Sequence, residues 1–309
     1  MSEVRRIAGG LWPAVLTPFE ESGAPALDVF EQLVDTLIRE GVDGLYLLGS
    51  TGQGPAMPAP QRKQVLERGV AVAAGRVPVM VHVGAISTRE SIELAEHAAS
   101  AGADAVSSVP PIYFPSGPDA VFEHYRRIAA ATELPFYPYH HAMFGDAVLR
   151  DADYPRRLLE IPHIAGMKVT ITDLYVFGVL ERATAGRLRL FSGADELLCH
   201  AALSGAVGAI GTSYNLWGPA CKAARSAIVG GDFDGARRFM AAFQSAIAEI
   251  LATGDFYGFL RSAMKLKYDL DIGPGQSPSS FAKTSWSCED VARLVSAVDE
   301  AVELPAGSS

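Results

Sequence analysis

Short apolar segments alternate with longer amphipathic segments along most of the chain. Short runs rich in Val, Ile, Leu and Ala are typical of buried strands, whereas apolar positions spaced three and four apart indicate helices. The predicted strands are Leu11–Leu16, Gly44–Leu48, Val77–Val83, Ala105–Val109, Phe136–His140, Ala165–Val169, Leu188–Ser192 and Val207–Ile210. The helices predicted between them are Leu27–Glu40, Pro60–Ala74, Ser87–Ala101, Asp119–Ala131, Asp153–Glu160, Asp173–Ala183 and Asp195–Ser204.

This order of elements predicts an α/β fold. Eight strand–helix units in series favour a parallel (β/α)8 barrel, a TIM barrel, over a doubly wound open sheet. Four further helices are predicted after the barrel, at Pro219–Val229, Asp234–Ala252, Tyr257–Lys267 and Glu289–Val302. We therefore expect a barrel over residues 1–215 and a C-terminal helical extension over residues 216–309, packed together as one domain.

Composition and charge narrow the possible partners. The 309 residues are 49% hydrophobic and carry a net charge of −9, with no basic run. This argues against nucleic acid binding, which needs clustered Lys and Arg. No apolar run approaches the roughly 18 residues of a membrane helix, and the first residues are too short and broken for a signal peptide. We expect a cytoplasmic protein whose three cysteines are reduced and form neither a disulfide framework nor a zinc site.

Lys168 is the most informative residue. It lies in the apolar, β-branched segment Ile161–Thr170, which predicts a buried strand. Burial disfavours the charged form of a lysine, and an uncharged lysine is a nucleophile that condenses with ketones. The alternative is a lysine at a strand end whose tip reaches solvent.

In a (β/α)8 barrel, the active site forms at the carboxyl ends of the strands. The second strand runs into Gly49–Gly54, which lacks the spacing of a dinucleotide-binding turn. Backbone N–H groups and hydroxyls of Ser50, Thr51 and Gly52 suit a carboxylate. An ordinary glycine-rich turn is the alternative.

Other polar residues follow the remaining strands. Tyr139 and Tyr113 offer phenols that could shuttle protons, or could simply pack in the core. His140 and His141 point to opposite faces of a strand, so we expect no metal site. Asp195 and Glu196 could cap the next helix or bind a polyhydroxyl chain.

Together these residues resemble the N-acetylneuraminate lyase / dihydrodipicolinate synthase superfamily of pyruvate-dependent class I aldolases. The resemblance runs from Gly10 to about Asn215. It identifies Gly49–Gly52 with the loop that holds the pyruvate carboxylate, Tyr139 with the catalytic tyrosine and Lys168 with the Schiff-base lysine. Tyr113 matches a tyrosine that one subunit lends to its neighbour.

The lyase branch fits best. Family lyases hold the sugar-derived hydroxyl chain with residues that match Thr170, Gly193, Asp195, Glu196 and Thr212. Dihydrodipicolinate synthases instead carry an arginine shortly after the catalytic tyrosine, and His141–Gly145 contains none. Two departures concern the pocket: Gln53 replaces the usual glutamate, and the usual Ile-Pro is replaced in the shortened His141–Phe144 loop.

The resemblance implies a lyase that cleaves, or condenses, a 2-keto sugar acid to pyruvate and an aldehyde. Lys168 would form the Schiff base without a cofactor, Ser50 and Thr51 would hold the carboxylate, and Tyr139 would relay a proton. Thr51 and a neighbouring subunit's Tyr113 would orient Tyr139, in a homotetramer or homodimer. The alternatives are a dihydrodipicolinate synthase, a 2-keto-3-deoxy sugar-acid aldolase or dehydratase, and a barrel without enzymatic activity.

Overall fold

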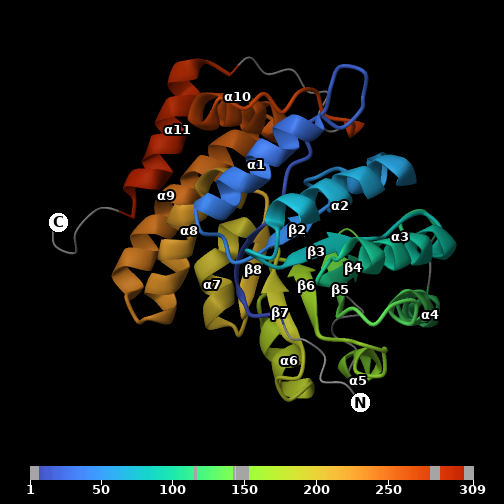
Figure 1. Cartoon of the computed structure of the whole chain (residues 1–309). Coiled ribbons are helices and arrows are strands. Elements are labelled where there is room, and N and C mark those ends of the chain that lie inside the picture. The colour runs from blue at the N-terminus through green and yellow to red at the C-terminus, as the bar shows by residue number, and fades with distance from the viewer. Residues whose placement is uncertain (1–6, 115–116, 142, 144–152, 279–285, 303–309) are drawn as a thin grey trace.

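Eight parallel strands form a nearly closed barrel, and helices cover its outside (Figure 1). The computed structural model describes residues 7–114, 117–141, 143, 153–278 and 286–302. The strands are β1 (Gly10–Pro13), β2 (Leu45–Leu47), β3 (Val79–His82), β4 (Ala105–Ser108), β5 (Phe136–His141), β6 (Gly166–Thr170), β7 (Arg189–Ser192) and β8 (Gly208–Gly211). Every end lies within three residues of its predicted position.

Helices follow the strands in the predicted order. Those of the barrel are α1 (Leu27–Arg39), α2 (Ala59–Ala73), α3 (Thr88–Ala101), α4 (Pro118–Ala129), α5 (Tyr154–Leu158), α6 (Tyr175–Ala183) and α7 (Leu198–Leu203), with short 3₁₀ turns η1 (Gly54–Ala56) and η4 (Asp195–Leu197). The helices behind it are α8 (Tyr214–Val229), α9 (Phe233–Ala252), α10 (Phe256–Tyr268) and α11 (Cys288–Glu300).

The strand order confirms the barrel and sets aside the open sheet. Neighbours pair in the order β1-β8-β7-β6-β5-β4-β3-β2. A single bridge between Ala14 and Tyr46 joins the two ends of this series, where the Val15 N–H donates to the Tyr46 carbonyl at 2.9 Å. The barrel therefore has one seam, between β1 and β2.

Two groups of buried side chains form the core. One lies inside the barrel and includes Trp12, Tyr46, Met80, Tyr137 and Phe191. The other, larger group fills the space between the strands and the helices. Because both faces of each strand are buried, the strands read as continuous apolar runs.

Two helices differ from their predicted bounds by three residues or more, and the others by at most two. The segment predicted as one helix over Asp195–Ser204 begins as η4 and becomes α7 only at Leu198. Helix α8 begins at Tyr214, five residues before the predicted Pro219, and its backbone is non-helical at Trp217. A proline inside a helix removes a backbone hydrogen bond, which explains the kink and the misplaced start.

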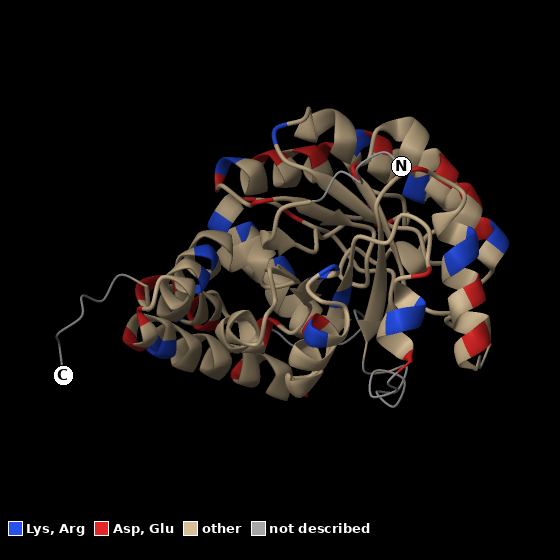
Figure 2. Cartoon of the chain, turned by 90° about the horizontal axis from the view of Figure 1, so that it is seen from below, with Lys and Arg blue, Asp and Glu red and all other residues tan. Residues whose placement is uncertain are grey.

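The surface of the barrel is formed by the outer helices. Figure 2 shows acidic and basic positions interspersed on these helices, while the central strands are almost entirely uncharged. Among the described residues, no helix is long and apolar enough to cross a membrane.

Candidate active site

Lys168 lies inside the barrel, as the strand pattern predicted. Its side chain is 5% exposed, and in the described residues it has no ion-pair partner. The Nζ atom lies 4.2 Å from the ring centre of Tyr139 and 4.6 Å from that of Tyr46. Two aromatic faces thus flank the amine, and no salt bridge to it is found among the described residues. The surroundings thus suit an amine that reacts rather than one that forms a salt bridge.

Tyr139 is held beside Lys168 by strand register and by aromatic contacts. It pairs with Lys168 across β5 and β6, so both side chains share the inner face. Its ring meets those of Tyr46, His82 and His141 edge-to-face, with centres 6.1–6.4 Å apart. The hydroxyl of Thr170 donates to the Tyr139 phenol oxygen at 3.4 Å. The phenol is therefore fixed close to the amine.

The loop after β2 has an unusual backbone. Leu48 and Gln53 have φ angles of 61° and 52°, in the left-handed region that non-glycine residues rarely adopt. An ordinary turn needs no such strain, whereas functional sites often store it. The hydroxyls of Thr51 and Thr212 are 2.6 Å apart, and Ser50 is exposed. The Thr51 hydroxyl thus contacts Thr212, which follows β8, and its expected role in orienting Tyr139 stays a prediction.

Gly193 lies at the end of β7, where there is no room for a side chain. A Cβ atom there would lie 1.8 Å from the Thr170 hydroxyl oxygen and 2.9 Å from Lys168 Cε. The glycine lets the backbone approach the lysine closely. Thr170, Gly193 and Lys168 are therefore brought together as predicted.

Asp195 is buried, and it caps no helix. Its Oδ2 accepts the Ser213 N–H at 2.7 Å, which ties the end of β7 to the end of β8. Burial raises the pKa of Asp195 to about 6. Glu196 is half-buried beside it. The carboxyl group of Asp195 is therefore mainly a structural contact, and its other oxygen, Oδ1, has no hydrogen-bond partner among the described residues.

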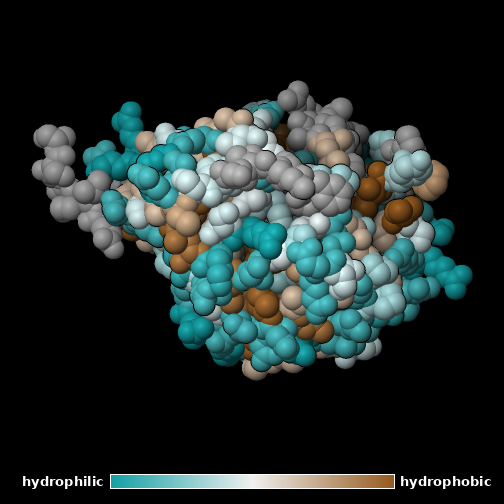
Figure 3. Space-filling model, turned by 90° about the horizontal axis from the view of Figure 1, so that it is seen from above, coloured by the Kyte–Doolittle hydropathy of each residue, from teal (hydrophilic) through white to brown (hydrophobic). Residues whose placement is uncertain are grey.

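Tyr113 lies outside the buried group. It is 74% exposed and packs edge-to-face on Phe114, with ring centres 5.2 Å apart. Ile112 and Met143 are exposed large hydrophobic residues as well. Figure 3 shows hydrophobic patches separated by hydrophilic side chains on the face seen from above.

Gln53, which replaces a glutamate of the resembling family, is buried and makes a structural contact. Its Oε1 accepts the N–H groups of Gln276 and Ser277 at 2.5 and 2.6 Å. A carboxamide oxygen can make these contacts without a charge. Gln53 thus links the loop after β2 to the segment after α10. Ala142 and Phe144 of the altered loop lie outside the described residues.

Three residues around the site were not predicted from sequence. Burial raises the pKa of the Tyr46 phenol and lowers that of His82 well below its ordinary range, so both stay neutral near pH 7. Arg62 is buried and donates to the carbonyls of His82 and Gly84 at 2.7 and 3.0 Å. Burial lowers its pKa to about 10. Because parallel strands are buried on both faces, the sequence does not show which residues face inward.

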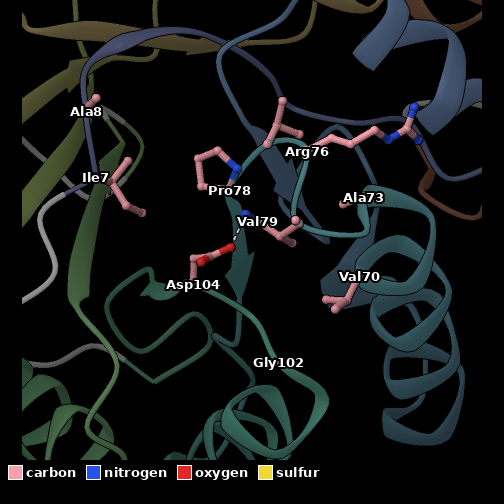
Figure 4. A pocket seen from close by; sticks show the side chains of 11 residues that line it. Ile7, Ala8, Val70, Ala73, Arg76, Pro78, Val79, Gly102 and Asp104 are labelled. Carbon is pink, nitrogen blue, oxygen red and sulfur yellow. Dashed lines mark hydrogen bonds between the residues drawn. The ribbon is translucent and has the colours of Figure 1, made fainter.

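A separate cavity of approximately 330 Å³ opens at the other end of the strands (Figure 4). Its lining includes Ile7, Arg76 and Pro78, and Asp104 accepts the Val79 N–H there at 2.9 Å. Val79 begins β3, so this cavity lies at the amino end, away from the end where Lys168 and Thr170 lie. No group of three or more metal-ligand side chains occurs in the described part of the chain.

Comparison with known proteins places the chain in a family. The profile of the dihydrodipicolinate synthetase family matches residues 8–285. The chain is 32% identical to the N-acetylneuraminate lyase of Rhizobium meliloti over 270 residues, covering 87% of this chain and 88% of the relative. It is 35% identical to that of Citrobacter koseri over 250 residues, covering 81% and 84%. The solved structure of the Ruminococcus gnavus sialic acid aldolase superposes with a TM-score of 0.87 at 26% identity, covering 96% of this chain and 99% of the other.

The fold, the buried lysine and these matches define the class of enzyme but not its substrate. The protein is a (β/α)8-barrel enzyme of the carbon–carbon lyase class, as predicted. It belongs to the dihydrodipicolinate synthetase family.

Proposed function

We propose that the protein is a Schiff-base-forming lyase that cleaves a 2-keto sugar acid to pyruvate and an aldehyde, in the manner of an N-acetylneuraminate lyase. The observation that carries the proposal is the position of Lys168: its Nζ is buried between the rings of Tyr46 and Tyr139, with no carboxylate to pair with it among the described residues. A ketone is the electrophile that such an amine attacks. The lyase names of the relatives support the same reaction class.

The proposed reaction follows from the arrangement. The uncharged amine of Lys168 adds to the C2 carbonyl, and loss of water gives an iminium. Tyr139 protonates the hydroxyl that leaves as water and becomes a phenolate; the phenolate then takes the proton of the C4 hydroxyl while the C3–C4 bond breaks, which releases the aldehyde and leaves an enamine. The proton then returns to C3, and water frees pyruvate. No step in this sequence needs a cofactor.

The substrate would bind along the carboxyl rim. Ser50 and Thr51 would hold the carboxylate with the N–H of Gly52. Hydroxyls further along would meet Thr170, Glu196 and Thr212, with Asp195 holding the rim in shape. Thr212 is already hydrogen-bonded to Thr51, so a carboxylate bound there would exchange for that contact.

Borohydride reduction in the presence of pyruvate tests the proposal. Reduction converts the iminium to a stable carboxyethyl-lysine, which peptide mass mapping locates. We expect the adduct on Lys168, and Lys265, an exposed lysine of α10, serves as an internal control. An adduct elsewhere, or none, would refute the mechanism.

A 2-keto-3-deoxy sugar-acid aldolase or dehydratase and a dihydrodipicolinate synthase remain the alternatives with the same Schiff base. Release of pyruvate from a panel of 2-keto sugar acids, and turnover with aspartate semialdehyde, separate them. A non-enzymatic barrel predicts that Lys168→Ala behaves like the wild type.

We also propose a homotetramer or homodimer, because exposed Tyr113 would be covered by a neighbouring subunit. Sedimentation of the full chain tests this, and a monomer that cleaves substrate would contradict it. The cytoplasmic location and the absence of nucleic acid and membrane partners stay predictions.

A further inference from the structure

A short segment after α10 crosses the seam of the barrel at its carboxyl end. The seam lies between β1 and β2, and the loops that follow these two strands both contact this segment. Phe19, in the loop after β1, donates its N–H to the Ile272 carbonyl at 3.0 Å. A Cβ atom at Gly273, whose φ is 66°, would lie 1.8 Å from the Phe19 carbonyl oxygen, so only glycine allows this approach. We call residues 271–277 the strap.

Gln53 joins the loop after β2 to the strap. Its carboxamide Oε1 accepts the N–H groups of Gln276 and Ser277 at 2.5 and 2.6 Å. The side chain of Gln53 is 5% exposed, so one buried oxygen receives two donors from successive residues of the strap. The strap is therefore hydrogen-bonded to both of the loops that flank the seam.

The backbone of Gln53 closes the turn that carries the expected carboxylate ligands. Its N–H donates to the Ser50 carbonyl at 3.1 Å, so Thr51 and Gly52 lie within a turn whose last residue is held by the strap. Gln53 has a φ of 52°, a strained conformation that persists only where surrounding contacts impose it. The two hydrogen bonds to its side chain are such contacts. The strap thus constrains the turn through a single residue.

We propose that Gln53 is a positioning residue for the carboxylate of the 2-keto acid. The strap holds the side chain of Gln53, and Gln53 in turn fixes the backbone of the turn that meets the ligand. A preformed turn loses less conformational entropy when the ligand binds, so it binds more tightly. The inference rests on the proposed function and deepens it: Gln53 acts on the binding of the carboxylate and leaves the reactivity of Lys168 unchanged.

Trapping of two ketones on Lys168 separates carboxylate binding from the reactivity of the amine. Borohydride trapping is measured against concentration with pyruvate and with acetone, a ketone without a carboxylate. Gln53→Leu removes the acceptor and keeps the bulk. We expect its half-saturating pyruvate concentration to rise about tenfold, since two hydrogen bonds that hold the turn are lost. Its rate of acetone trapping should change by less than about twofold, because the amine attacks any ketone.

Two further variants complete the experiment. Gln53→Glu keeps an oxygen acceptor and should stay within about threefold of the wild type with both ketones. Gln32→Leu makes the same replacement at an exposed position of α1 and should change neither ketone. If Gln53→Leu does not fold, Gln53→Asn takes its place with the same expectation, because its side chain is one methylene shorter and asparagine tolerates a left-handed φ.

Three results would overturn the role of Gln53. They are an equal loss with both ketones in Gln53→Leu, no change with pyruvate in that variant, and a Gln53→Glu protein that binds pyruvate as weakly as Gln53→Leu. A wild type that traps no pyruvate on Lys168 is a different result, because it refutes the proposed function itself.

Discussion

The two ends of the barrel are built from the same strands but use their charged side chains differently. At the amino end, carboxylates accept backbone N–H groups: Asp104 accepts that of Val79, and Asp43 accepts that of Leu11 while pairing with Lys222. At the carboxyl end, Lys168 is buried between aromatic rings without an ion pair among the described residues. At the amino end these carboxylates thus stabilise the starts of strands, whereas at the carboxyl end only Asp195 makes such a contact in the site, with the Ser213 N–H, and the Lys168 amine is left available for a ligand.

Replacement of Lys168 should have the largest effect on the carboxyl end of the barrel. Lys168→Ala should lower cleavage by about 10³-fold or more and abolish the borohydride adduct, because the nucleophile is gone. Steady-state pyruvate release and mass mapping measure both. Lys265→Ala, at an exposed position of α10, is the matched control and should keep full activity. Residual cleavage within tenfold of the wild type would contradict the assignment.

Tyr139→Phe removes the phenol hydroxyl and keeps the aromatic ring, so it separates the roles of the two. The ring contact with Lys168 is kept while the proton relay is lost, so we expect kcat to fall by about 10²-fold or more with pyruvate trapping retained. Steady-state pyruvate release measures kcat, and rapid quenching with borohydride measures how fast pyruvate is trapped on Lys168. An unchanged kcat would show that another group moves the proton.

Gly193→Ala tests the close approach beside the lysine. The added methyl would force Thr170 and Lys168 apart, and we expect a loss of about 1–3 kcal/mol in the free energy of unfolding together with slower adduct formation. Urea unfolding and trapping rates measure these effects. A Cβ atom at Gly117 would meet no atom of the described residues within 4 Å, so Gly117→Ala should change neither.

Asp195 gives the carboxyl end a pH dependence. Its pKa is raised to about 6 in the folded chain, above the roughly 3.9 of an unfolded aspartate. Its contribution to stability is therefore full below pH 4 and is lost as the pH rises through about 6. The difference in unfolding free energy between Asp195→Asn and the wild type should therefore shift in favour of the variant by roughly 1–3 kcal/mol from pH 4 to pH 8. Urea unfolding of both proteins at pH 4 and pH 8 tests this. The same difference in unfolding free energy at both pH values would contradict the raised pKa of Asp195.

The smallest effect belongs to the amino end. Asp104→Ala removes the acceptor of one backbone N–H and should cost about 1 kcal/mol of unfolding free energy. Adduct formation on Lys168 should stay unchanged. If Asp104→Ala impaired trapping as strongly as Gly193→Ala, the two ends would not be separate in function.

The sequence predicts the architecture well because strand and helix periods differ clearly. Apolar runs located every strand, Gly49–Gly52 follows β2, and Tyr139 and Lys168 lie within β5 and β6. Asp195 was harder, because an aspartate before a helix looks like a cap, while here it turns inward to Ser213.

Inward-facing partners were not accessible from sequence. Tyr46 and His82 lie in strands that are buried on both faces. Apolar and polar residues therefore do not alternate along these strands, and the sequence does not show which side chains face inward. The buried Arg62 sits in a helix whose charged pattern predicts a solvent face. Their roles depend on the three-dimensional register.

The single Ala14–Tyr46 bridge has a thermodynamic consequence. Every other junction between neighbouring strands is a ladder, so local opening of the barrel should begin at this seam. Tyr46 both forms the bridge and supplies one of the two rings beside the lysine. Fluctuations that open the barrel at this seam would therefore let water reach the Lys168 amine first. The rigidity of the β1–β2 junction would thus limit the solvent access of the reactive nitrogen.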